Sequence, residues 1–473
     1  MSGVSRNIAM GVGGFTLLIA TMLALLFGVD GAQATAQVQA QAQARSGGAG
    51  NFLGVATCGG TTCHGRSVPN TPDIGVVRQD EILIWQDPAS AAGAHSRAFA
   101  ILQEPRSRQI AQNLGIGEAT SAPECLGCHS TPTAPSQRGA RFLRSDGVSC
   151  EGCHGAASPW LSYHYSAGAT HRGNLDRGLV ALEDPLKRAE TCLNCHFGNE
   201  DPDRFVTHRL MAAGHPRISF ELDLFSTLQA HHDEDQDYKD RKRPVSNVQM
   251  WAIGQSMALQ RSLTLFTETK RGVDGIFPEF YFLDCHSCHR QIFDQRDFRQ
   301  TVVNNPSRPL PSGMPPYNDE NMIMLSAAAR VIDPQGARRF DDSSRAFHAA
   351  MASNPGEVRT AARRLKAEAG TLARRFADNG ISDAQVFRII EAITSQAVSP
   401  RFTDYAGSVQ AVMATDTLLS SLVNSGQVTP DAAESIRGDI NTAYRAVRDP
   451  NEYQPREFRT SLGRAASAIR RLR

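Results

Sequence analysis

Ten cysteines fall into five close pairs, and a histidine directly follows the second cysteine of every pair. Two thiols at this spacing can each bond one vinyl edge of a porphyrin while the adjacent imidazole binds the iron. The pattern therefore predicts five covalently attached c-type haems. The attachment cysteines are Cys58 and Cys63, Cys125 and Cys128, Cys150 and Cys153, Cys192 and Cys195, and Cys285 and Cys288, and the proximal iron ligands are His64, His129, His154, His196 and His289.

Two other cysteine chemistries compete with haem attachment, and the following histidine argues against both. Disulfides do not require a histidine after each pair, and zinc sites combine two cysteine pairs, or one pair with a distant histidine pair. The first segment, CGGTTCH, has two more intervening residues than the Cys-x-x-Cys-His of the other four. A disulfide between Cys58 and Cys63 therefore stays open as an alternative, and four haems would then remain.

Nine further histidines are candidates for the sixth ligand of each iron. His348 lies alone in the region without an attachment motif and is excluded. His231 and His232 open the acidic run HHDEDQD, which favours a solvated face. His286 stands inside a motif and would face away from that haem. The remaining candidates are His95, His164, His171, His208 and His215.

The segment DGVSCEGCHGAASPWLSYH, residues 146–164, closely resembles the third haem motif of the nitrifier tetrahaem cytochrome c-554 family. The order of the motifs agrees over roughly residues 50–235. The resemblance implies haems in stacked pairs and electron transfer along them. It also implies His95 and His164 as distal ligands, followed by His171, His208 and His215. The fifth motif and the C-terminal extension have no match in that family, so the redox partner and the direction of electron flow are not inherited.

Around these motifs we expect a mainly α protein. Residues 51–305 predict a pentahaem cytochrome c domain of short helices and loops wrapped on stacked haems, which take the place of an apolar core. One longer helix is expected at about 248–266. Residues 306–317 are a Pro-rich linker. Residues 318–473 predict a helical bundle without a cofactor, with helices ending near Gly380, starting at Asp383 and starting at Thr429.

The first 34 residues predict export. An uncharged run at 8–29 follows Arg6 and precedes a small-residue pattern, as in a signal peptide, but it is also long enough for a retained N-terminal membrane anchor. Residues 35–50 are an Ala/Gln-rich flexible tether. We therefore expect a periplasmic protein, and both fates of the N-terminal segment stay open.

These features favour electron transfer through five mostly bis-histidine haem c groups, with redox proteins of the periplasm or membrane as partners. The net charge of +1 gives no field that would attract nucleic acid. The alternative is an oxidoreductase that acts on a small nitrogen or sulfur compound at one five-coordinate haem. No sequence feature isolates a catalytic site, so the electron carrier is preferred over the enzyme.

Overall fold

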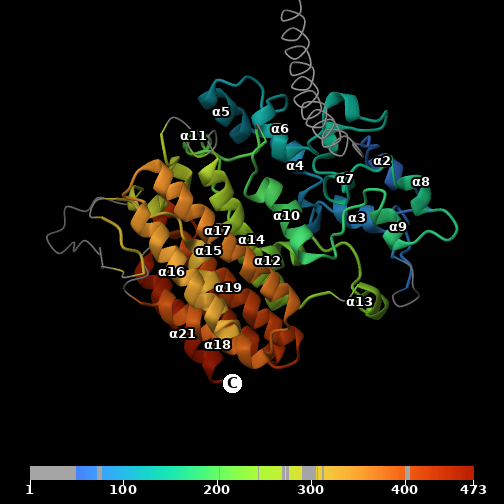
Figure 1. The fold of residues 1–473 in the computed structure, drawn as a ribbon. Helices are drawn as coiled ribbons and strands as arrows, with labels where there is room; N and C mark the ends of the chain where they lie inside the picture. The colour runs from blue at the N-terminus through green and yellow to red at the C-terminus, as the bar shows by residue number, and fades with distance from the viewer. Residues whose placement is uncertain are drawn as a thin grey trace, which may run out of the picture. The chain divides into compact units, whose positions relative to one another are not determined.

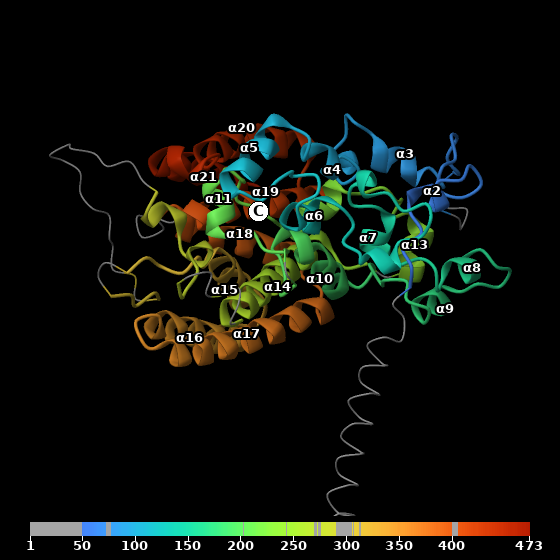
Figure 2. The same cartoon turned by 90° about the horizontal axis from the view of Figure 1, so that it is seen from above.

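The computed structural model describes residues 50–71, 77–201, 203–242, 244–268, 272, 276–289, 305, 307–311, 314–399 and 405–473. These ranges are mainly helical and contain no β-strand (Figures 1 and 2), and Leu283 and Tyr317 form an isolated antiparallel bridge. This confirms the expected mainly α fold. The predicted signal or anchor segment lies outside the described residues. None of the helices within them is long and apolar enough to span a bilayer.

The chain divides into two compact units, and the smaller one comprises residues 1–52 and 156–179. Its described part contains α8 (Leu161–His164) and α9 (His171–Leu175). Asn51 and Ser158 join its two segments, because the Asn51 amide donates to the Ser158 hydroxyl at 2.7 Å. The Arg177 guanidinium lies 3.9 Å from the centre of the Tyr163 ring and holds the end of α9 against α8.

The larger unit, residues 53–155 and 180–473, carries all five attachment motifs. Its first part consists of helices of 4 to 12 residues, which are marginal on their own in water. They are α2 (Val55–Cys58), α3 (Glu81–Gln86), α4 (Ala98–Ile101), α5 (Pro105–Leu114), α6 (Pro123–His129), α7 (Cys150–His154), α10 (Pro185–His196), α11 (His208–Ala212), α12 (Leu222–Leu228) and α13 (Gln236–Lys242).

The second part of this unit is a bundle of longer helices, drawn from yellow-green to red in Figure 1. Helices α16 and α17 pack together along one edge of it, as both ribbon views show. The helices expected near 248–266, before Gly380, from Asp383 and from Thr429 are present. The bundle comprises α14 (Asn247–Thr267), α15 (Glu320–Ile332), α16 (Pro334–Ala350), α17 (Pro355–Asp378), α18 (Asp383–Ala397), α19 (Tyr405–Asn424), α20 (Pro430–Ala446) and α21 (Pro455–Arg470).

The apolar core belongs to this bundle. Apart from Phe205, every buried member of the main hydrophobic cluster lies at or after Val248. Helix α14 shares that core, and a buried amide chain fixes it there: Gln255 accepts from Asn321 of α15 at 2.8 Å and donates to Gln410 of α19 at 3.0 Å. Of two smaller apolar clusters, one lies within the motif-bearing part and the other is shared with Met250 and Ala258 of α14. This distribution is what a domain built around large cofactors requires. The domain boundaries drawn at 305 and 318 stay a prediction.

The start of α12 makes stability depend on pH. Burial, followed by the charge of Glu221, raises the pKa of Asp223 from 3.8 to about 7. Between those values the folded state binds this proton more tightly than the unfolded state, so the free energy of unfolding falls as pH rises from about 4 to 7.

We expect Asp223→Asn to remove this fall of up to about 4 kcal/mol in the free energy of unfolding, since an asparagine oxygen can still accept from Asn247. Urea unfolding at pH 5 and 7.5 measures it, and identical pH dependence in both proteins would contradict it.

Candidate haem-binding centre

Three attachment motifs lie on helices, which explains their spacing. In α6, α7 and α10 the first cysteine, the second cysteine and the histidine occupy positions i, i+3 and i+4. Residues at these separations share one helix face, so the two thiols and the imidazole point to the same side. Pro123 and Pro185 start α6 and α10 at the position where proline is preformed for a helix.

The first and fifth motifs use turns instead. Cys58 ends α2, and the two additional residues form a turn in which the Cys63 amide donates to the Gly60 carbonyl at 2.8 Å. This turn returns Cys63 and His64 toward Cys58, whose carbonyl accepts from the His64 amide at 3.1 Å. In the fifth motif, Asp284 caps the short 3-10 turn Cys285–Ser287. All ten cysteines lie within the described residues, and none of them forms a disulfide there.

Attachment motifs distant in sequence lie beside one another. Helix α2, which ends at Cys58, packs on α7, which begins at Cys150. The Cys128 thiol lies 4.0 Å from the Cys195 carbonyl oxygen. The first motif is therefore the neighbour of the third, and the second is the neighbour of the fourth.

Four of the five proximal histidines face another histidine across a similar gap. Two imidazoles bound to opposite sides of one metal, with metal–nitrogen bonds of about 2 Å, have ring centres about 6 Å apart. The pairs are His95 with His196 at 6.0 Å, His129 with His215 at 6.4 Å, His208 with His289 at 6.1 Å, and His154 with His231 at 6.3 Å and His232 at 6.0 Å. These separations fit one iron atom between each pair of rings.

His154 is unusual because two histidines face it. The coordinating nitrogens of His154, His231 and His232 all lie within 4.8 Å of one another. The run HHDEDQD was expected to be a solvated face, but the structure turns both imidazoles of its first two residues toward His154. The only sequence signal for this placement is the position of the doublet, between the fourth motif and the first bundle helix.

Burial keeps four of the facing imidazoles neutral at physiological pH, as a metal ligand must be. Burial lowers the pKa of His196 to about 4, and burial followed by the charge of His232 lowers that of His231 to about 4. Burial also lowers the pKa of His95 and of His215 below the usual range. Their lone pairs are thus available to an iron.

The first proximal histidine is held by a carboxylate. His64 Nδ1 lies 2.9 Å from Glu81 Oε2, and this hydrogen bond is the main reason that the pKa of His64 is raised. Burial raises the pKa of Glu81, but its bonds to His232 and His64 outweigh burial and lower it overall. Glu81 is therefore a carboxylate at neutral pH.

The structure brings three of the five sequence-predicted distal candidates, His95, His208 and His215, to a proximal histidine. The other two belong to the smaller unit: His164 ends α8 with its ring 5.5 Å from that of Trp160, and His171 begins α9. His348 is fully buried in the bundle, 3.6 Å from Asp319, and takes no part in these pairs. His286 packs on Tyr453 with ring centres 5.1 Å apart.

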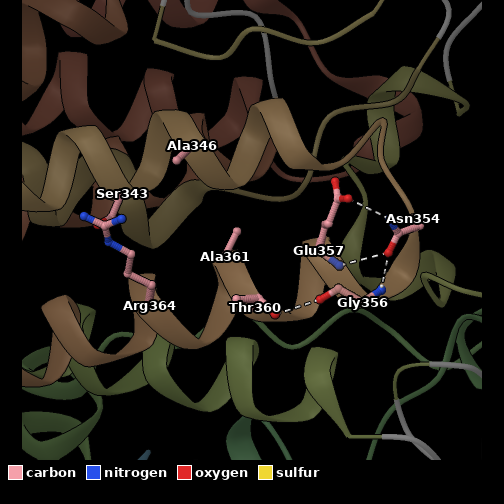
Figure 3. A pocket seen from close by; sticks show the side chains of 8 residues that line it. All are labelled: Ser343, Ala346, Asn354, Gly356, Glu357, Thr360, Ala361 and Arg364. Carbon is pink, nitrogen blue, oxygen red and sulfur yellow. Dashed lines mark hydrogen bonds between the residues drawn. The ribbon is translucent and has the colours of Figure 1, made fainter.

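A pocket of about 610 Å³ lies elsewhere, between α16 and α17 (Figure 3). Figure 3 shows Asn354, Gly356 and Glu357 at the start of α17, and Arg364 and Ser343 toward the other end of the groove. Because no cysteine or histidine lines this pocket, it is not a haem site. Its lining residues are Ser343, Ala346, Asn354, Gly356, Glu357, Thr360, Ala361 and Arg364.

Comparison with known proteins gives one match. No curated protein and no solved structure matches the chain. Residues 81–155, which contain His95, the second and third motifs and Glu81, match the family described as cytochrome c554 and c-prime. With the paired thiols, the following histidines and the facing imidazoles, this match supports a c-type cytochrome that binds haem c covalently, with its iron, and serves haem-based electron transfer.

Proposed function

We propose that the chain is a periplasmic electron carrier with five haem c groups, one at each attachment motif. The observation that carries this proposal is the set of facing imidazoles about 6 Å apart at four of the five proximal histidines. The bound iron supplies a one-electron redox couple. Histidines on both sides of an iron saturate its coordination, which suits outer-sphere electron transfer better than substrate binding.

These distances support the following pairing of ligands. His196 pairs with His95, His129 with His215, His289 with His208, and His154 with one residue of the doublet at 231 and 232. His164, in the smaller unit, is a sixth-ligand candidate by its offset from the third motif, as in the tetrahaem family, and is not paired with a particular haem. His171 is the remaining sequence candidate.

The protein supplies the rest of the electron-transfer machinery. The attachment helices and turns fix each ring, and the packing of α2 on α7 and the contact of Cys128 with Cys195 bring neighbouring haems close. The N-terminal segment exports the chain and is either removed or kept as an inner-membrane anchor. Donor and acceptor are redox proteins of the periplasm or its membrane. The cofactor-free bundle provides a rigid mount for the motif-bearing part.

The test is haem stoichiometry and spin state in the exported, matured protein. We expect five haems per chain by alkaline pyridine assay, and a low-spin electron paramagnetic resonance spectrum that nitrite, hydroxylamine and cyanide do not change. Four haems would remove Cys58 and Cys63 from the attachment set. A high-spin signal that shifts with these ligands would favour the oxidoreductase with one five-coordinate haem instead.

A further inference from the structure

Glu81, the first residue of α3, is a buried carboxylate that contacts histidines from two distant segments. Its Oε2 lies 2.9 Å from His64 Nδ1, and its Oε1 lies 3.5 Å from His232 Nδ1. His64 belongs to the first attachment motif, and the His232 ring lies 6.0 Å from that of His154 in the third. One side chain therefore reaches both haem sites.

The surrounding contacts hold this arrangement in place. The Gln79 amide donates to Glu81 Oε1 at 3.2 Å, and the Ile82 amide donates to the His64 carbonyl at 3.0 Å. Arg78 pairs with Asp80 at 3.0 Å and with Asp233 at 3.3 Å. These ion pairs tie the residue after His232 to the residue before Glu81, so the doublet is fixed against the start of α3.

An independent observation places the same two sites together. The first and third motifs are neighbours because α2, which ends at Cys58, packs on α7, which begins at Cys150. A negative charge between neighbouring haems acts on both, since electrostatic interaction decays slowly in a partly buried environment. A carboxylate that accepts from the Nδ1–H of a ligand histidine also makes that imidazole a stronger donor, which favours oxidised iron.

We propose that Glu81 is a shared positioning residue that orients the histidines of the first and third haem sites and lowers both reduction potentials together. This inference rests on the proposed function, because it requires haems at both motifs. The two haems then have similar reduction potentials, so the electron is not held much more tightly by one than by the other.

The experiment is a spectroelectrochemical titration of the fully loaded protein and its Glu81→Gln variant. Glutamine keeps the length and one oxygen that can still accept from the closer donor, His64 Nδ1–H, while its NH2 group cannot accept from His232 and the charge is lost. We expect two potentials to rise, each by a tenfold or larger change in the reduction equilibrium, which is about 59 mV for one electron. Glu190→Gln, on the exposed face of α10, is the matched control. It should change every reduction potential by less than about 59 mV.

The outcomes separate this inference from the proposed function. Haem counting and spin state in the unaltered protein test the latter. If the unaltered protein holds haem at both motifs and Glu81→Gln shifts one potential or none, sharing by Glu81 is wrong. If Glu81→Gln fails to load haem, Glu81→Asp decides, because its shorter side chain keeps the charge but cannot reach both imidazoles. At least one of the two potentials should then rise, and two unchanged potentials would overturn the inference.

Discussion

Replacing His95 with alanine is expected to convert one haem from low-spin to high-spin and to leave the haem count unchanged. His95 faces His196 at 6.0 Å, and both imidazoles are kept neutral by burial. Attachment depends on Cys192, Cys195 and His196, which the substitution does not touch. Loss of the facing imidazole therefore removes only the sixth ligand.

Electron paramagnetic resonance and optical spectra of the oxidised variant measure this change. One haem equivalent should become high-spin and should bind cyanide, and added imidazole should return it to the low-spin state by filling the vacated position. His286→Ala is the matched control, because His286 packs on Tyr453 rather than on a proximal histidine. A His95→Ala spectrum identical to that of the unaltered protein would show that His95 does not ligate an iron.

The identity of the cofactor could be predicted from sequence because attachment is local. Both thiols and the proximal imidazole lie within five residues in α6, α7 and α10. The facing histidines are different, since His95 is about a hundred residues from His196. Only the fold brings them together, and the sequence indicated His95 by elimination among the spare histidines and by the resemblance to a known family.

The doublet at 231 and 232 could not be predicted, because a charge run is usually solvated. The ion pair between Arg78 and Asp233 reverses that expectation. It uses one acid of the run to fix the doublet against α3. The charge composition of a segment predicts how such segments lie on average. In this protein, the ion pair between Arg78 and Asp233, which are 155 residues apart, holds the histidine doublet against α3.

Bundle helices with a polar face were predictable, and those without one were not. In α17, Val358, Leu365, Leu372 and Phe376 recur at helical spacing, with Asn354 as the cap. Helix α19 is buried on nearly every side, so it shows no apolar stripe. Its polar residues are satisfied internally, as when Thr417 donates to Glu221 at 3.0 Å, and such pairing is visible only after folding.

The second prediction with a large expected effect concerns stability, at the contact between the fifth motif and the bundle. Arg217 is 9% exposed at its side chain and lies 3.4 Å from Glu320 of α15, whose side chain is 10% exposed. The same guanidinium donates to Cys285 Sγ at 3.2 Å and lies over the Tyr281 ring. Burial alone would lower the pKa of Arg217, but the charge of Glu320 and other neighbours raises it, so the group is a buried cation.

Glu320→Ala should therefore destabilise the protein by about 3–5 kcal/mol, because it leaves that cation without its carboxylate in a desolvated site. Far-UV circular dichroism in urea measures the loss. Glu434→Ala, which breaks an exposed pair with Arg437, should cost at most about 1 kcal/mol. Arg217→Met combined with Glu320→Leu should recover most of the stability, since no unpaired charge then remains. If Glu320→Ala were as stable as the unaltered protein, water would reach Arg217. The bundle would then not anchor the fifth motif through the pair of Arg217 and Glu320.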